Sequence, residues 1–191
     1  MVLVQFRVTV PDVDRFVAAV KELMPMADAD GARRQALYAA ESDSSEMSML
    51  AEWESHDAMM ASSEARGGDF QAQAGTEGLD WDTRIWHRLA GAEARIPTDD
   101  PSVLVQFRVT VPDPDRFRRA FEDSTSDMAS DGARLAAIYA SESDANEIGW
   151  FAEWDSHDAM MASSEERGEA FQAAAGTEGL DWETRIWHRL A

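Results

Sequence analysis

The sequence predicts an α+β fold in which two βαββαβ repeats form one barrel within a single chain. One observation is an internal duplication: residue i aligns with residue i+101 without a gap from Val2 to Ala90, and 60 of the 89 aligned pairs are identical. A second is that β-rich and helical stretches occur in the same order in both copies. We therefore expect repeat 1 at residues 1–90, a linker at 91–102 and repeat 2 at 103–191.

Each repeat is expected to begin with a strand and a helix. VLVQFRVTV at 2–10 alternates and is rich in β-branched residues, which is typical of a strand. PDVDRFVAAVKEL at 11–23 is predicted as a helix with Asp12 as its N-cap. In repeat 2, Pro114 falls at the first helical position, where a proline is well accommodated.

A β-hairpin, a second helix and a last strand follow. RRQALYAAES at 33–42 and EMSMLAEW at 46–53 are predicted strands joined by an acidic turn. Ser55 is expected to cap a helix over 56–75, and the segment 83–90 is predicted as the final strand. This order is the split βαβ, or ferredoxin-like, arrangement. Its helices cover one sheet face, so two fused units can bury their open faces against each other.

Composition excludes several classes of function. The 37 acidic and 17 basic side chains give a net charge of −20, which disfavours binding to nucleic acid. The absence of cysteine excludes disulfides and thiolate chemistry. With no apolar run of membrane-spanning length and no recognisable signal peptide, we expect a cytoplasmic protein that does not bind membranes.

Two motifs give the sequence a resemblance to a known family. G-A-R-x-x-x-x-Y in the second strand precedes E-W-x-S-x-x-A at the start of the second helix, and both occur in each repeat. This pattern resembles the dimeric α/β-barrel superfamily, and within it the antibiotic biosynthesis monooxygenase-like group. The matching residues are Gly31, Tyr38, Glu52, Trp53, Ser55 and Ala58, with Gly132, Tyr139, Glu153, Trp154, Ser156 and Ala159 in repeat 2.

The resemblance implies cofactor-free oxygenation of a small aromatic or polyketide-like substrate, in which the substrate anion itself reduces O₂. Two departures qualify it. Family members that form quinones are associated with an Asn and a Trp, whereas Asn146 is the only asparagine here and lies in a predicted turn. Members that degrade haem use a histidine late in the second helix, where this chain has FQAQAG and FQAAAG.

Successive residues of a strand point to opposite faces of the sheet, and this alternation, or parity, identifies candidate site residues. Val2, Val4, Phe6 and Val8 are expected to face the helices, which points Gln5 and Arg7 into the barrel, with Gln106 and Arg108 as equivalents. An inward arginine is a natural clamp for an anionic oxygen. The alternative is that Arg7 pairs with an inward acid.

Aromatic residues supply candidate walls for a flat ligand. Trp53 and Trp154 would line the barrel cavity if their strand face is internal; otherwise they are core residues. Tyr38 and Tyr139 are candidate pocket donors, with core packing as the alternative.

The last strand supplies the candidate base. His87 and His188 share one face of it, while Trp86 and Trp187, further candidates for substrate binding, share the other. Parity does not decide which face is internal. A histidine suits general-base catalysis, although a strand histidine is often structural.

The favoured hypothesis is therefore a cofactor-independent monooxygenase. In it Arg7 and Arg108 hold an anionic oxygen, and His87 and His188 accept a proton. The alternatives are a non-catalytic ligand-binding or stress-response barrel and a cofactor-free cyclase or isomerase. No metal motif or nucleotide fingerprint is present, so we expect neither a metal nor a cofactor. The fused chain is a pseudo-dimer whose further homodimerisation stays open.

Overall fold

The computed structural model describes residues 1–91 and 103–191. The predicted order βαββαβ occurs twice in it. Repeat 1 contains β1 (Val2–Thr9), α1 (Val13–Ala29), β2 (Ala32–Ala40), β3 (Glu46–Trp53), α2 (His56–Ala74) and β4 (Asp82–Gly91). Repeat 2 contains β5 (Val103–Thr110), α3 (Pro114–Ser130), β6 (Ala133–Ser141), β7 (Glu147–Trp154), α4 (His157–Ala175) and β8 (Glu183–Arg189). Residues 92–102 of the predicted linker lie outside the described residues.

The eight strands form a closed antiparallel barrel, so the predicted fold class is confirmed. Their order around it is β1-β3-β2-β8-β5-β7-β6-β4. Within each repeat the third strand is central: β3 pairs with both β1 and β2, and β7 pairs with both β5 and β6.

The chain divides into two compact units whose ends differ from those of the repeats. Unit 1 comprises Met1–Ile85 and His188–Ala191, and unit 2 comprises Trp86–Trp187. The difference arises because the last strand of each repeat runs on into the other unit. In unit 2 the end of β4 pairs with β6, and in unit 1 Leu37 exchanges backbone hydrogen bonds with the chain end at Leu190 and Ala191.

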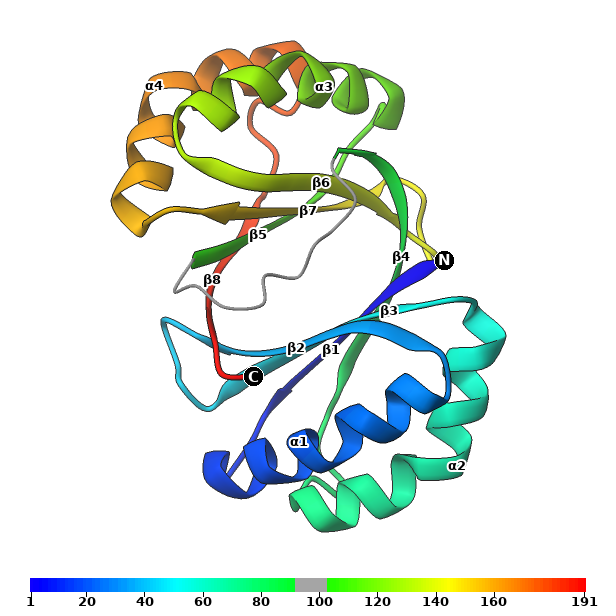
Figure 1. The fold of residues 1–191 in the computed structure, drawn as a ribbon. Helices are drawn as coiled ribbons and strands as arrows, with labels where there is room; N and C mark the ends of the chain where they lie inside the picture. Colours follow the sequence, from blue (N-terminus) through cyan, green and yellow to red (C-terminus); the bar gives the residue numbers. More distant parts are fainter. Residues whose placement is uncertain (92–102) are drawn as a thin grey trace. The chain divides into compact units, whose positions relative to one another are not determined.

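In each unit the two helices cover one face of the sheet (Figure 1). In unit 1, Phe16 and Val20 of α1 pack with Leu37 and Met47 of the sheet, and all four are almost fully buried. Burial of such side chains stabilises the fold by roughly 1.5–3 kcal/mol each. Unit 2 repeats this layer, with Phe117 and Phe121 of α3 in the core.

The helix starts follow the predicted capping residues. The Asp12 carboxylate accepts from the backbone N–H of Arg15, and the Ser55 hydroxyl accepts from that of Ala58. The prediction for the first helix was wrong at its end, because α1 continues through Pro25 to Ala29. Met24 before the proline and Ala27 after it both pack in the core, so the apolar face of α1 continues across the position where proline removes a backbone hydrogen bond.

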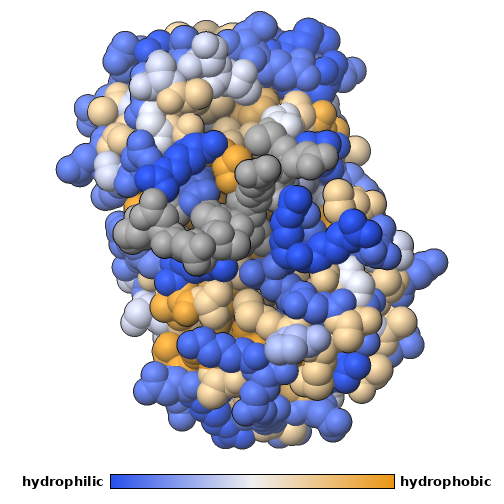
Figure 2. All heavy atoms as spheres, in the orientation of Figure 1, coloured by the Kyte–Doolittle hydropathy of each residue, from blue (hydrophilic) through white to orange (hydrophobic). Residues whose placement is uncertain are grey.

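Hydrophilic residues dominate the surface drawn in Figure 2, and apolar residues appear among them in small groups. This is consistent with the net charge of −20. Within the described residues, no helix is both long enough and apolar enough to cross a membrane.

Candidate functional site

Each unit has a pocket between its helices and its sheet. The unit 1 pocket has a volume of about 310 Å³ and is formed by α1, α2, the strands β1, β2 and β3, and the start of β4 with the segment that leads into it. The unit 2 pocket has a volume of about 280 Å³ and is formed by the equivalent elements other than β6. Both volumes are near the lower end of the range for sites of small organic ligands.

Aromatic side chains form much of the unit 1 pocket wall. Phe6, Trp53, Phe70 and Trp81 all line it. The Trp81 ring lies 6.4 Å from that of Phe6 in an edge-to-face arrangement and 6.3 Å from that of Phe70. Such a wall favours a flat aromatic ligand.

The register between β1 and β3 explains why these residues meet. Phe6 lies opposite Met49, and Val2 lies opposite Trp53. Side chains directly opposite each other share a sheet face, and here that face is covered by the helices. From the other side, α2 presents Ser62, Arg66 and Phe70, which are four residues apart and therefore on one helix face.

A fixed arginine lies at the edge of the unit 1 pocket. Arg66 donates from Nε to Asp30 Oδ2 at 2.6 Å and from Nη2 to Asp30 Oδ1 at 3.0 Å. The Ser62 hydroxyl also donates to Asp30 Oδ2, at 2.8 Å. The hydrogen bond from Arg66, followed by that from Ser62, lowers the pKa of Asp30 to about 2. The same bond raises the pKa of Arg66, so its guanidinium stays charged.

Unit 2 contains the same arrangement. Arg167 donates to both oxygens of Asp131, at 2.7 Å and 3.3 Å, and the Ser163 hydroxyl donates to Oδ2 at 2.8 Å. The hydrogen bond from Arg167 is the largest cause of the lowered pKa of Asp131. Each pocket therefore has one oriented cation at its edge.

Two tryptophans of the unit 1 pocket contain unsatisfied polar groups. The indole nitrogens of Trp53 and Trp81 are buried and have no hydrogen-bond partner among the described residues. A buried donor without an acceptor costs about 1–3 kcal/mol. An oxygenated ligand that reached either indole would remove that cost.

A glycine inside the second helix of each unit leaves pocket space open. Gly67 of α2 and Gly168 of α4 line the two pockets, and a Cβ built at either position meets no atom within 4 Å. A glycine in a helix interior costs roughly 1 kcal/mol relative to alanine. The neighbouring Gly68 is replaced by Glu169 in repeat 2, so only the pocket glycine occurs in both copies.

Of the predicted site residues, Trp53 and Trp154 line the pockets. They do so on the helix-covered face of the sheet, not on the opposite face where the ligand was expected. This position is compatible with their predicted role in substrate binding.

The other predicted binding residues are buried on the opposite sheet face. Gln5 donates to the Ser48 hydroxyl at 3.0 Å, and Gln106 accepts from the Trp187 indole at 3.2 Å. The Trp86 ring lies 6.0 Å from that of Phe151 in an edge-to-face arrangement. Tyr38 and Tyr139 are also buried, opposite Ser48 and Gly149 in the β-ladders.

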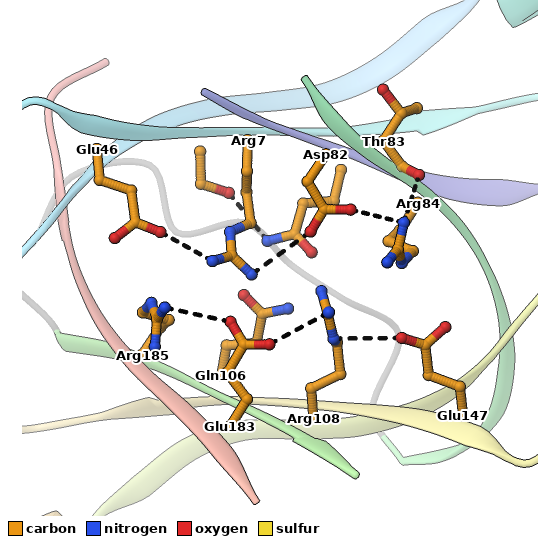
Figure 3. Close-up of polar contacts among 12 residues, drawn as sticks. Arg7, Glu46, Asp82, Thr83, Arg84, Gln106, Arg108, Glu147, Glu183 and Arg185 are labelled. Atoms are coloured by element: carbon orange, nitrogen blue, oxygen red, sulfur yellow. Dashed lines mark hydrogen bonds and ion pairs between the residues drawn. The ribbon is translucent and has the colours of Figure 1, made fainter. Parts of the chain in front are cut away.

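The two candidate arginine clamps are held by acids. Arg7 lies 2.8 Å from Glu46 and 3.7 Å from Asp82, which also contacts Arg84 (Figure 3). The structure therefore contains the alternative arrangement, in which Arg7 pairs with acids. In unit 2, Arg108 lies 3.2 Å from both Glu147 and Glu183, and Arg185 also contacts Glu183 (Figure 3).

The candidate histidine bases lie at the surface, each within hydrogen-bond distance of a glutamate. His87 Nε2 lies 3.0 Å from Glu142, and His188 Nε2 lies 2.9 Å from Glu41. Both histidine side chains are about half exposed, at 48% and 50%. The buried face of each last strand is thus the one that carries Trp86 or Trp187. Neither histidine, and neither arginine clamp, is among the residues that line the two pockets.

Sequence reasoning missed several pocket residues. Phe6 was assigned to the helix-facing side but was treated only as core. Arg66, Gly67 and Phe70 lie in the helix predicted over 56–75, but the sequence prediction did not include their shared face as a pocket wall. A helix face that contains an arginine and a glycine is unusual for pure core packing, and this signal could have found them.

Comparisons with known proteins agree with this architecture. A family model described as antibiotic biosynthesis monooxygenase matches residues 1–67, which confirms the resemblance seen in the sequence. No curated protein matches the chain.

Solved structures share the fold over nearly the whole chain. An anthrone oxidase-like protein superposes with a TM-score of 0.70 at 15% identity, covering 100% of this chain and 91% of its own. A monooxygenase-like protein from Listeria innocua gives a TM-score of 0.62 at 10% identity, covering 100% and 94%. The heme-degrading enzyme LmHde from Listeria monocytogenes gives 0.58 at 9% identity, covering 97% and 98%. At these identities the similarity concerns the fold alone.

Proposed function

We propose that the protein oxidises a small electron-rich aromatic with O₂, without a bound cofactor, and the match of residues 1–67 to the antibiotic biosynthesis monooxygenase model supports this. The reaction takes place in the pockets between helices and sheet. This places the site on the other sheet face from the one expected from Arg7 and His87.

The observation that carries the proposal is the unit 1 pocket itself. Its wall combines four aromatic rings with one oriented guanidinium, that of Arg66. Gly67 keeps space open in it at a cost in helix stability, and the buried indoles of Trp53 and Trp81 lack acceptors among the described residues. A flat ligand that carries oxygen atoms matches all of these features.

Arg66 is the one ionisable side chain among the described residues that line this pocket. It cannot act as a base, because a guanidinium stays protonated in proteins. It favours the anionic form of a phenol or enol, and that anion is the electron-rich species that reacts with O₂. The substrate proton then leaves to solvent, and the pocket shields the anion from water.

The oxidation balances without an external reductant. When a methylene between aromatic rings becomes a carbonyl, two C–H bonds break and one C=O bond forms. One atom of O₂ enters the product, and the other leaves as water with the two hydrogens. The substrate supplies all four electrons.

Of two other functions, haem degradation fits the pockets less well, and ligand binding without catalysis is the main rival. Haem degradation, the activity named for the Listeria monocytogenes structure, needs a larger pocket and usually a histidine on the iron, and no histidine lines either pocket in the described chain. A non-catalytic barrel that binds an aromatic ligand fits the pockets as well, and only turnover separates it from an oxygenase.

The test is oxygen consumption by the intact chain with a panel of polyphenols and anthrones, together with quenching of tryptophan fluorescence as a measure of binding. Gly67→Leu and Gly168→Leu place a side chain in each pocket. We expect the doubly substituted chain to lose both binding and oxygen consumption.

Gly68→Leu is the matched control, because Gly68 lies in the same helix with open space around it and does not line the pocket. It should retain both signals. Binding without oxygen consumption across the panel would replace the oxygenase by a binding module. Unchanged turnover in the doubly substituted chain would exclude these pockets as the site.

A further inference from the structure

The two pockets differ in extent at one end. All thirteen residues that line the unit 2 pocket have repeat equivalents that line the unit 1 pocket. Six residues line only the unit 1 pocket, and we call the space beside them the lobe: Val20, Met24, Gln35, Ala36, Leu50 and Ala51.

Aromatic rings occupy the corresponding place in unit 2. Trp150 stands where unit 1 has Met49, and Phe121 stands where it has Val20. The two rings lie 5.5 Å apart, edge to face, and the Phe121 side chain is fully buried. Trp150 also packs 5.0 Å from Phe171 and 5.4 Å from Phe107. This rigid cluster fills the space that the smaller side chains leave open in unit 1.

The lobe in unit 1 is apolar except for Gln35, which forms a fixed wall. Met24 in the lobe and Met49 beside it are unbranched and adapt to different ligand shapes. The Gln35 amide is held in place, since Nε2 donates to the backbone carbonyl of Met24 and to Asp28 Oδ1, both at 2.8 Å. Repeat 2 has Ala136 at that position. The lobe therefore suits an alkyl or acyl chain, or an additional ring.

We propose that the two pockets take aromatic ligands of different length, and that the Met49/Trp150 and Val20/Phe121 pairs set the limit. Unit 1 accepts an aromatic that carries an apolar extension, and unit 2 accepts a compact one. This inference rests on the proposed pockets but needs no oxidation step, so it is tested by binding alone.

The probes are 4-alkylphenols from phenol to 4-hexylphenol, titrated against the intact chain by calorimetry. Gly168→Leu leaves the unit 1 pocket free, and Gly67→Leu leaves the unit 2 pocket free. Each methylene that enters an apolar lobe should tighten binding about fourfold. In the Gly168→Leu chain we expect this gain to continue along the alkyl series, whereas in the Gly67→Leu chain it should stop after the first carbons.

Exchange of the two residue pairs gives the decisive comparison. In the Gly67→Leu chain, we add Trp150→Met and Phe121→Val, and the affinity of unit 2 should then rise up to a longer alkyl chain. In the Gly168→Leu chain, we add Met49→Trp and Val20→Phe, and the affinity of unit 1 should then stop rising at a shorter alkyl chain. Circular dichroism checks folding. If the variant with the larger side chains, Met49→Trp with Val20→Phe, does not fold, the Trp150→Met variant decides alone, because that substitution only removes side-chain volume.

The outcomes separate this inference from the proposed function. Equal length dependence in the two singly blocked chains, or no change on exchange, overturns the length limit and leaves the pockets as aromatic sites. Absence of binding by every phenol in both chains overturns the pockets themselves, and the inference with them.

Discussion

Arg66 and Asp30 join the two helices of unit 1 through a pair of parallel hydrogen bonds, at 2.6 and 3.0 Å. Asp30 caps the end of α1, and Arg66 lies in the middle of α2 at the edge of the pocket. The bond therefore both fastens the helix pair and orients the cation that a ligand would meet. Its strength depends on the ionisation of Asp30, which makes it sensitive to acid.

Stability should fall in acid through Asp30. Its pKa is lowered from 3.8 to about 2, so the folded state binds this proton less readily than the unfolded state. The resulting stabilisation is complete above the unfolded value and is lost as the pH falls towards 2. We expect Asp30→Asn to flatten the dependence of the unfolding free energy on pH between about 4 and 2. Urea unfolding at a series of pH values measures this.

Asp69→Asn is the control for this experiment, because it removes an exposed carboxylate from the same helix as Arg66. It should leave the fall in unfolding free energy at acidic pH unchanged. If Asp30→Asn and the native sequence lose the same unfolding free energy in acid, Asp30 is not the group responsible.

The rate of oxidation should follow the ionisation of the substrate. The described lining residues of the unit 1 pocket include no side chain that can act as a base near neutral pH, and Arg66 stabilises the substrate anion. We expect kcat/KM to rise with pH to a plateau, with a midpoint that shifts when phenols of different pKa are compared. Arg66→Met should lower kcat/KM by about 10²-fold. A midpoint common to all substrates would instead indicate a titrating group on the protein.

Arg7 should contribute to stability and not to ligand binding. Its side chain is 10% exposed and lies between two acids, Glu46 and Asp82. Removal of one partner from such a pair leaves a charge poorly compensated, at a cost of about 3 kcal/mol. We expect Arg7→Met to lower the urea midpoint while phenol affinity stays within about twofold. A large loss of affinity in a folded variant would restore the clamp hypothesis.

The two strand histidines should be dispensable for turnover. His87 and His188 lie at the surface, paired with Glu142 and Glu41. Even when both partners are charged, an exposed pair of this kind contributes only about 0–1 kcal/mol. We expect His87→Ala with His188→Ala to leave the rate of oxygen consumption and the urea midpoint nearly unchanged. A tenfold slower rate in the double variant would support the predicted general base.

The sequence was sufficient to predict the element order, the caps and the face of each β1 residue. Periodicity and capping depend on local interactions, which neighbouring residues determine. The location of the pocket was not predictable in this way, because parity separates Phe6 from Arg7 but does not say which sheet face leaves space for a ligand. That space depends on how closely α1 and α2 approach the sheet, and on small residues such as Gly67 that are distant in sequence from Trp53.

The exchange of strand ends between the units was not predictable for a related reason. Each repeat is complete as a sequence pattern up to Ala90 or Ala191. The pairing of Trp86 with Ser141 instead of a partner in its own repeat depends on hydrogen bonds between segments far apart in the chain. Local patterns contain no information on that choice.

Gly75 and Gly78 should respond differently to alanine although both have positive φ, 70° and 76°. The Gly75 position faces the Arg15 guanidinium, which an added Cβ would meet at 2.8 Å, whereas a Cβ at Gly78 meets nothing within 4 Å. Arg15 donates to the carbonyls of Ala72 and Gln73 at 2.7 Å and so satisfies the end of α2. Both substitutions incur a cost of about 1 kcal/mol for the left-handed backbone. Gly75→Ala should lose about 1 kcal/mol more, because it displaces this arginine. Urea unfolding of the two variants measures the difference, and equal destabilisation would show that Arg15 moves aside without loss.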